Sequence, residues 1–247
     1  MSAEQNNWFD QGGEAYARYR PTYPEALAAF LGHDVPGGAA LDVGCGNGQL
    51  TCQLAEHVAS VVGVDPSADQ LAHAQPHPRV RYACAPAEAT GLPARSVGLV
   101  TAAQAAHWFD LPRFHGEVRR VATPGARVAL VSYGAPELEP DLDDRFQHFY
   151  RDEIGPYWPP ERALVDSGYA TMDFPFTELP VPAMDIERSW TCADLLGYIS
   201  TWSATRRARE AGREDLLVAF GEALTAPWGT GRRRVRWPVR MRMGRVE

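Results

Sequence analysis

One stretch, Ala39–Asp65, constrains the fold of this chain more than any other. Ala39–Val43 is an apolar run that suits a buried parallel strand, and Gln49–His57 has helical spacing. Ser60–Val64 is rich in β-branched residues and suits a second strand. A strand–helix–strand unit of this kind packs with a right-handed crossover in a parallel sheet. The stretch therefore predicts an α/β protein built on a parallel sheet.

The turn between this first strand and the helix carries three alternate glycines. Gly44, Gly46 and Gly48 leave the turn without side chains, so a ligand can lie directly on the backbone. Asp65 ends the second strand 21 positions after Gly44, where a carboxylate can bind both hydroxyls of a ribose. The sequence therefore predicts a site for a nucleoside-containing cofactor.

An acidic residue before the turn bears on which cofactor that is. The dinucleotide fingerprint needs a glycine at position 49, where this chain has glutamine. The Asp42 carboxylate would repel a pyrophosphate, but it suits a ligand that carries an ammonium group. The pattern Asp42-x-Gly44-x-Gly46-x-Gly48 resembles the first motif of the class I S-adenosylmethionine (SAM) dependent methyltransferases. A nicotinamide-dependent oxidoreductase and a non-catalytic SAM sensor remain as alternatives.

Two further segments resemble one branch of this family, the trans-aconitate methyltransferase-like branch of the type 11 methyltransferases. The pattern Y-x-x-x-R-P-x-Y-P at positions 16–24 resembles the opening of that branch, which folds over the cofactor as a lid. The run A-Q-A-x-H-W-F-D at positions 103–110 resembles a second segment of it. The resemblance implies that Tyr16 and Arg20 face the methionine end of SAM and that Gln104 binds its amino acid part. It also implies that His107 and Trp108 face the methyl acceptor.

The predicted site has a cofactor set and an acceptor set. The resemblance places Ala87 and Glu88 at the adenine, although Glu88 also reads as a solvated loop residue. Trp108 taken alone favours core packing, because buried aromatic residues near the end of a sheet are more often core. The predicted cofactor contacts are Tyr16, Arg20, Asp42, Gly44, Cys45, Gly46, Asp65, Pro66, Ala87, Glu88 and Gln104. The predicted acceptor and catalytic residues are His107, Trp108, Tyr133, Trp158 and Arg162.

The remaining elements predict a doubly wound, seven-stranded, mostly parallel sheet in a single domain. Apolar runs at Val80–Cys84, Ser96–Ala102 and Ala126–Ser132 suit further parallel strands. Phe174–Ser189 and an alternating strand at 234–243 would add an antiparallel hairpin at the edge. The predicted parts are N-terminal lid helices at 1–34, a SAM-binding core at 35–133, a helical cap insertion at 134–170, and a C-terminal hairpin with helices at 171–247. The insertion either covers the acceptor, with the run Gly155-Pro156-Tyr157-Trp158 and Arg162 in its wall, or is an ordinary surface cap.

Composition excludes several classes of function. All 24 basic residues are arginine, which excludes a Schiff-base lysine and a P-loop. The four cysteines form no C-x-x-C pair, so no metal site is expected. A net charge of −7 argues against nucleic acid as a partner, and no apolar run is long enough to predict a membrane span. We expect a cytoplasmic monomer or homodimer whose partner is a small-molecule acceptor.

The expected reaction is methyl transfer from SAM to that acceptor, which leaves S-adenosylhomocysteine. The protein then mainly has to align the acceptor and exclude water. A carboxylic acid acceptor is already a nucleophile at neutral pH and needs no base, which would give O-methylation. A hydroxyl or amine acceptor would need a base, and His107 is the candidate that the sequence places well.

Overall fold

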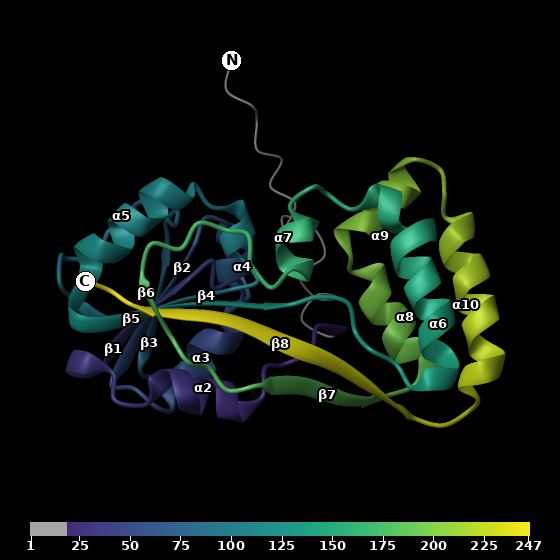
Figure 1. Cartoon of the computed structure of the whole chain (residues 1–247), viewed down its shortest axis with the longest axis horizontal. Helices are drawn as coiled ribbons and strands as arrows, with labels where there is room; N and C mark the ends of the chain where they lie inside the picture. The colour runs from purple at the N-terminus through teal and green to yellow at the C-terminus, as the bar shows by residue number, and fades with distance from the viewer. Residues whose placement is uncertain (1–18) are drawn as a thin grey trace, which may run out of the picture.

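The computed structural model describes residues 19–247, and these form a sheet-based half and a helical half (Figure 1). Residues 1–18 of the predicted lid segment at 1–34, including Tyr16, lie outside the described residues. None of the described helices is long and apolar enough to cross a membrane.

A single sheet carries all the described strands, in the order β3-β2-β1-β4-β5-β8-β6, with β7 also paired to β8. Neighbours among the first five are parallel, whereas β8 runs antiparallel to β5, β6 and β7. Because β1 lies between β2 and β4, the winding direction reverses beside β1, where doubly wound sheets bind their ligands. The strands are β1 (Ala39–Val43), β2 (Ser60–Asp65), β3 (Val80–Cys84), β4 (Val97–Ala103), β5 (Ala122–Tyr133), β6 (Thr177–Leu179), β7 (Met184–Trp190) and β8 (Arg233–Arg245).

Helices cover both faces of the parallel part of the sheet, as predicted. Val128 and Leu130 of β5 belong to one core, with side chains of α5, while Ala129 and Val131 belong to the other, with α2 and α3. This alternation is expected of a strand that is buried on both faces. The elements around the sheet are α2 (Glu25–Gly32), η1 (Pro36–Gly38), α3 (Gln49–Ala55), α4 (Ala68–Ala72), η2 (Ala106–Trp108) and α5 (Leu111–Val121).

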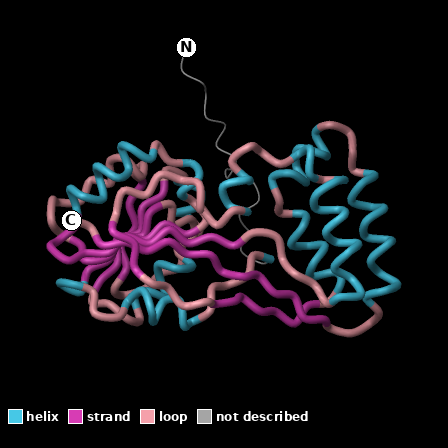
Figure 2. The backbone as a smooth tube through the Cα atoms, viewed as in Figure 1, coloured by secondary structure: helices cyan, strands magenta, loops and turns pink. Residues whose placement is uncertain are grey.

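The helices of the helical half gather at one end of the molecule (Figure 2), and they come from two separate stretches of the chain (Figure 1). Phe149 stacks on Phe220 with ring centroids 4.0 Å apart, and Phe146 packs edge-on against Trp202. The predicted cap at 134–170 therefore shares its core with the later helices. The first stretch holds α6 (Pro140–His148), η3 (Phe149–Glu153), η4 (Gly155–Tyr157) and α7 (Arg162–Asp166), and the second holds α8 (Cys192–Ser200), α9 (Ser203–Glu210) and α10 (Asp215–Trp228).

Proline accounts for two details of the edge strands. The predicted strand at Phe174–Ser189 is two strands, β6 and β7, because Pro180 and Pro182 fall between them and cannot donate to a ladder. Pro238 stands within β8, between the backbone pairs Tyr133–Val239 and Glu137–Arg236. Pro238 therefore has no backbone partner among the described residues on the β5 side of β8. A proline requires such an unpaired position, because it has no N–H to donate to a neighbouring strand.

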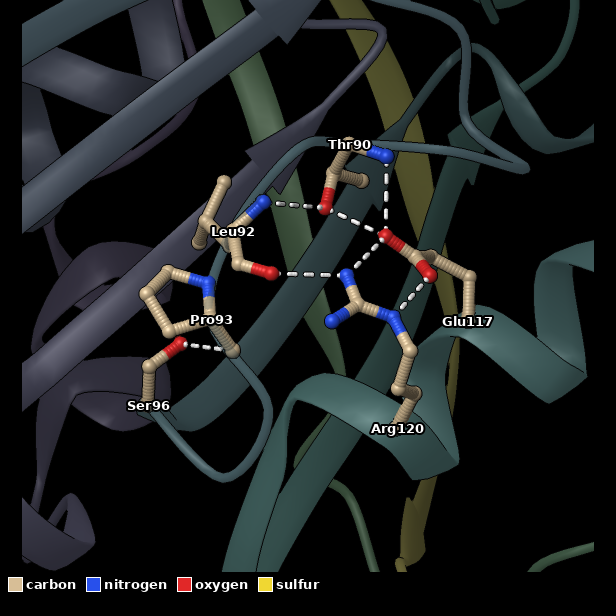
Figure 3. A network of polar contacts seen from close by, with 6 residues as sticks. All are labelled: Thr90, Leu92, Pro93, Ser96, Glu117 and Arg120. Atoms are coloured by element: carbon tan, nitrogen blue, oxygen red, sulfur yellow. Dashed lines mark hydrogen bonds and ion pairs between the residues drawn. The ribbon is translucent and has the colours of Figure 1, made fainter.

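A network of polar contacts ties the loop after β3 to α5 (Figure 3). The backbone N–H and hydroxyl of Thr90 both donate to Glu117 Oε1, at 2.8 and 2.6 Å. Arg120 donates to the same carboxylate and to the carbonyl of Leu92, at 2.7 Å. The Arg120 hydrogen bond is the main reason that the pKa of Glu117 falls to about 2. The network fixes the segment that carries Ala87 and Glu88.

The close approach of η1 to β4 gives a first prediction. A methyl group on Gly98 would overlap the carbonyl oxygen of Pro36 and lie 2.8 Å from its carbonyl carbon. We expect Gly98→Ala to lower the free energy of unfolding by about 1–3 kcal/mol, because the backbone of η1 must move. Chemical denaturation measures the change. Gly116→Ala is the matched control: a methyl group at this position of α5 would have no other atom within 4 Å, and it should stabilise by about 0.5–1 kcal/mol. Equal effects of the two substitutions would contradict this packing argument.

Candidate functional site

The glycine turn after β1 is open above one of its three glycines. All three have positive φ, at 65° for Gly44, 55° for Gly46 and 83° for Gly48. A methyl group on Gly44 would overlap Ala105, and one on Gly48 would overlap Tyr82. At Gly46 the nearest atom would be 3.7 Å away. The turn therefore leaves room for a ligand beside the backbone of Gly46.

Asp65 lies beside this open position, at the carboxyl end of β2. Its carboxylate accepts the backbone N–H of Gly46 at 2.8 Å and that of Ser67 at 2.9 Å. Burial raises the pKa of Asp65, and the two N–H groups oppose that rise. Pro66, the next residue, is exposed. The backbone thus fixes a carboxylate at the place where the sequence predicts one for a ribose.

Asp42 supports the turn from below. Its side chain is 1% exposed, and its two oxygens accept the hydroxyl groups of Thr51 and Thr101, both at 2.7 Å. Burial is the main reason that the pKa of Asp42 rises to about 6. The carboxylate therefore joins β1 to α3 and β4, and its direct contact with a cofactor stays a prediction.

Other predicted cofactor residues have roles within the fold. Cys45 is largely buried, which raises the pKa of its thiol, so small size rather than reactivity suits this position. Ala87 is part of the core. Glu88 accepts the backbone N–H of Asp110 at 2.9 Å, which fixes the start of α5. Contacts of these side chains with adenine stay predictions.

Gln104 lies where β4 ends and has a strained backbone. Its φ of 55° is in the left-handed region, which costs about 1–3 kcal/mol for a residue other than glycine and is typical of functional sites. Its side-chain amide donates to the carbonyl of Tyr133 at 2.7 Å and so links the ends of β4 and β5. The ring of Tyr133 packs edge-on against Tyr23.

Arg162 and Trp158 lie together, with two neighbours that the sequence analysis missed. The guanidinium carbon of Arg162 lies 4.5 Å from the centroid of the Trp158 ring. Arg162 Nε donates to the Tyr150 hydroxyl at 2.8 Å and to Asp166 Oδ1 at 3.0 Å. Arg162 and Asp166 stand four residues apart on α7, a spacing that could have suggested the pair. Nothing in the sequence points to Tyr150.

His107 belongs to the same neighbourhood. Its Nδ1 lies 3.1 Å from the hydroxyl of Tyr169, and its ring packs against Trp108 with centroids 4.8 Å apart. Burial lowers the pKa of His107 to about 3, and the positive charge of Arg162 acts in the same direction. The imidazole is therefore neutral at pH 7 and a weak base.

Arg20 lies against the helical half. Its guanidinium carbon is 5.5 Å from the centroid of the Tyr198 ring, and its Nη2 lies 3.5 Å from the carbonyl of Thr201. Its predicted contact with the methionine end of a cofactor stays untested.

The arginine-rich strand β8 is largely neutralised by acidic residues. Arg233 forms ion pairs with Glu139, the residue before α6, and with Asp141 in the first turn of α6. Arg236 pairs with Glu137 and Asp185. Paired arginines of this kind favour a structural role over phosphate binding. Within residues 19–247 there is also no group of three or more His, Cys, Asp or Glu side chains that could hold a metal ion.

Comparisons with known proteins assign the family. A family model described as a methyltransferase domain matches residues 41–130. A protein of Dictyostelium discoideum named as a methyltransferase is 33% identical over 227 residues, covering 90% of this chain and 86% of that protein. A solved structure described as a type II methyltransferase from Anaeromyxobacter dehalogenans is 48% identical, with a TM-score of 0.86, and covers 92% of this chain and 98% of that one. The chain belongs to the class I SAM-dependent methyltransferases.

The nicotinamide alternative is therefore wrong, and the glycine turn can be judged as a SAM site. The open space at Gly46 and the fixed carboxylate of Asp65 fit a ligand with a ribose. When the Asp42 carboxyl is ionised, it places a negative charge beneath the turn, and this charge suits the positively charged groups of SAM. These residues of the methyltransferase thus fit the cofactor that its family uses.

The site gives a prediction about cofactor affinity. Asp65→Ala removes a carboxylate that would accept hydrogen bonds from ribose hydroxyls. Such bonds to a charged group contribute about 1.5–3 kcal/mol each, so we expect SAM to bind at least ~10-fold more weakly. Titration calorimetry with SAM measures this, and circular dichroism checks the fold. Asp69→Ala, in the first turn of α4, is the control and should keep the parent affinity. Unchanged affinity in a folded Asp65→Ala protein would mean that Asp65 does not face the ribose.

The pKa of His107 predicts a pH dependence of stability. The unfolded histidine titrates near 6.5, while the folded one stays neutral down to about 3. Between these values the unfolded state binds more protons, so falling pH destabilises the folded protein. Compared with His107→Gln, the parent should lose about 2 kcal/mol more between pH 7.5 and pH 5. Urea denaturation of both proteins at each pH measures the difference. Asp42 acts in the opposite direction but is present in both. Equal losses would show that His107 is not held neutral.

Proposed function

We propose that this methyltransferase transfers the methyl group of SAM to an oxygen of a small carboxylic acid. The observation that carries the proposal is that the guanidinium of Arg162 has terminal nitrogens free to bind a ligand. Its side chain is 15% exposed, and its two terminal nitrogens donate no hydrogen bond to any residue of the described part of the chain. A guanidinium is well shaped to bind a carboxylate through two parallel hydrogen bonds.

The neighbours of Arg162 support an acid over an amine or phenol. His107, with a pKa of about 3, is a weak base at neutral pH, and a phenol or amine acceptor would need a stronger one. A carboxylate is already ionised and requires no base. The resemblance to the trans-aconitate methyltransferase-like branch, on residues 103–110, supports the same class of acceptor.

The residues of this chain would divide the work between the two halves. When bound, SAM supplies a methyl group on a positively charged sulfur. Gly46 and Asp65 would hold its nucleoside part beside β2, and Gln104 its amino acid part at the end of β4. Arg162 would orient the acid, while Trp158 and Trp108 would exclude water from it. Alignment of this kind is the main contribution that the protein needs to make.

The test is a screen of small mono-, di- and tricarboxylic acids, phenols and amines for SAM-dependent release of S-adenosylhomocysteine. We expect acids to be methylated. Arg162→Met should raise the KM for the acid at least ~10-fold, because a charge-assisted hydrogen bond contributes about 1.5 kcal/mol or more, and should leave SAM affinity unchanged. Arg20→Met tests whether that arginine serves the cofactor instead. Arg209→Met, in an exposed ion pair of α9, is the control.

Two outcomes would contradict the proposal. Methylation of a phenol or amine, with no acid turned over, would overturn the acceptor class. Binding of SAM without turnover of any acceptor would favour the non-catalytic sensor.

A further inference from the structure

The side of Arg162 that carries Nε is already occupied. Nε donates to both Tyr150 and Asp166, at 2.8 and 3.0 Å. The Tyr150 hydroxyl in turn lies 3.0 Å from both carboxylate oxygens of Asp166. The three side chains therefore form a closed triad, in which each member contacts the other two.

The triad determines which edge of the guanidinium stays open. A guanidinium can bind a carboxylate side-on, through Nε and one terminal nitrogen, or end-on, through Nη1 and Nη2. Tyr150 and Asp166 take up Nε, and the ring of Trp158 lies against the guanidinium. The end-on edge is the one that remains. Trp158 Nε1, a donor without an acceptor role, is also buried and has no partner among residues 19–247.

The triad is anchored to the sheet. A methyl group on Gly134, directly after β5, would lie 3.1 Å from Asp166 Oδ1 and 3.7 Å from Asp166 Cα. The carboxylate therefore packs on the chain where β5 ends, and α7 is the helix of the helical half that lies nearest to the sheet (Figure 1). Gln104 reaches the same end of β5 through the carbonyl of Tyr133. Arg162 is thus held at a defined place relative to the end of β4.

Tyr150 also keeps the negative charge of Asp166 away from the open edge. A carboxylate that paired with the terminal nitrogens of Arg162 would compete with an anionic ligand. The hydroxyl of Tyr150 instead contacts both carboxylate oxygens, and the carboxylate meets Arg162 at Nε. The positive edge consequently stays available.

We propose that Tyr150 and Asp166 are positioning residues for the acceptor: they fix Arg162 so that Nη1 and Nη2 bind a planar carboxylate end-on. This inference rests on the proposed function, since it assumes an acid acceptor. According to this inference, the protein selects an acid over the corresponding uncharged amide through the fixed orientation of Arg162 as well as through the charge of Arg162.

The test compares Tyr150→Phe and Asp166→Asn with the parent, using the best acid from the screen and its amide as a competitive inhibitor. Both substitutions keep the shape of the side chain. We expect the KM for the acid to rise about 5- to 10-fold, which is less than the loss of a whole charge-assisted hydrogen bond, because Arg162 keeps its charge and loses only its fixed orientation. The kcat at saturating acid and the affinity for SAM should stay within about 2-fold. The ratio of the inhibition constant of the amide to the KM for the acid should fall by about the same factor as the KM for the acid rises.

A matched control separates positioning from a general loss of structure. Asp144→Asn makes the same chemical change as Asp166→Asn at an exposed aspartate of α6 outside the triad. It should behave as the parent does. A purely structural role would lower kcat, SAM affinity and stability together, without a change in the preference for acid over amide, and that result would overturn the inference.

The two proposals fail in different ways. If Arg162→Met raises the KM for the acid while Tyr150→Phe and Asp166→Asn do not, the positioning role is wrong and the acid acceptor stands. If the parent methylates only phenols or amines, the proposed function is wrong and the inference falls with it.

Discussion

The rest of the site depends on the hydrogen bonds of a buried carboxylate beneath the glycine turn. An ionised or polar group that is this deeply buried destabilises a fold unless it is hydrogen-bonded. Asp42 meets this requirement with the hydroxyl groups of Thr51 and Thr101, which come from α3 and β4. Three elements are thereby held together at the point where the sheet reverses its winding. The position of Gly46 relative to Asp65 follows from this arrangement.

The proposed acceptor side of the site depends on an arginine that the helical half brings to the sheet. Arg162 stands on α7, which contacts both the end of β5 and the segment that carries His107. Its charge helps to keep His107 neutral, so the same residue that suits an acid acceptor also weakens the nearby base. The two effects favour one kind of chemistry. Under the proposed function, Arg162 would bind the acid and would also add to the effect of burial in keeping His107 a weak base.

Local sequence signals predicted much of the fold and the place of the glycine turn beside Asp65. The parallel strands and the glycine turn depend on neighbours in sequence, and the structure has them, with the Asp65 carboxylate beside the turn. The Tyr150–Arg162–Asp166 triad could not be predicted in full, because Tyr150 reaches α7 from a different helical segment. The break between β6 and β7 followed from two prolines that the sequence analysis did not weigh. Long-range partners of this kind have no periodic signature.

The sharing of β8 between the two halves limits how this methyltransferase can open. Residues 239–245 pair with β5, residues 233–239 pair with β7, and Arg233 forms an ion pair with Asp141 of α6. One continuous strand thus crosses from the parallel sheet to the helices. Rotation of the halves about a hinge would have to bend this strand and break backbone pairs on one side of it. Exchange of ligands therefore depends on local movement of the connecting segments, with the sheet itself acting as a fixed frame.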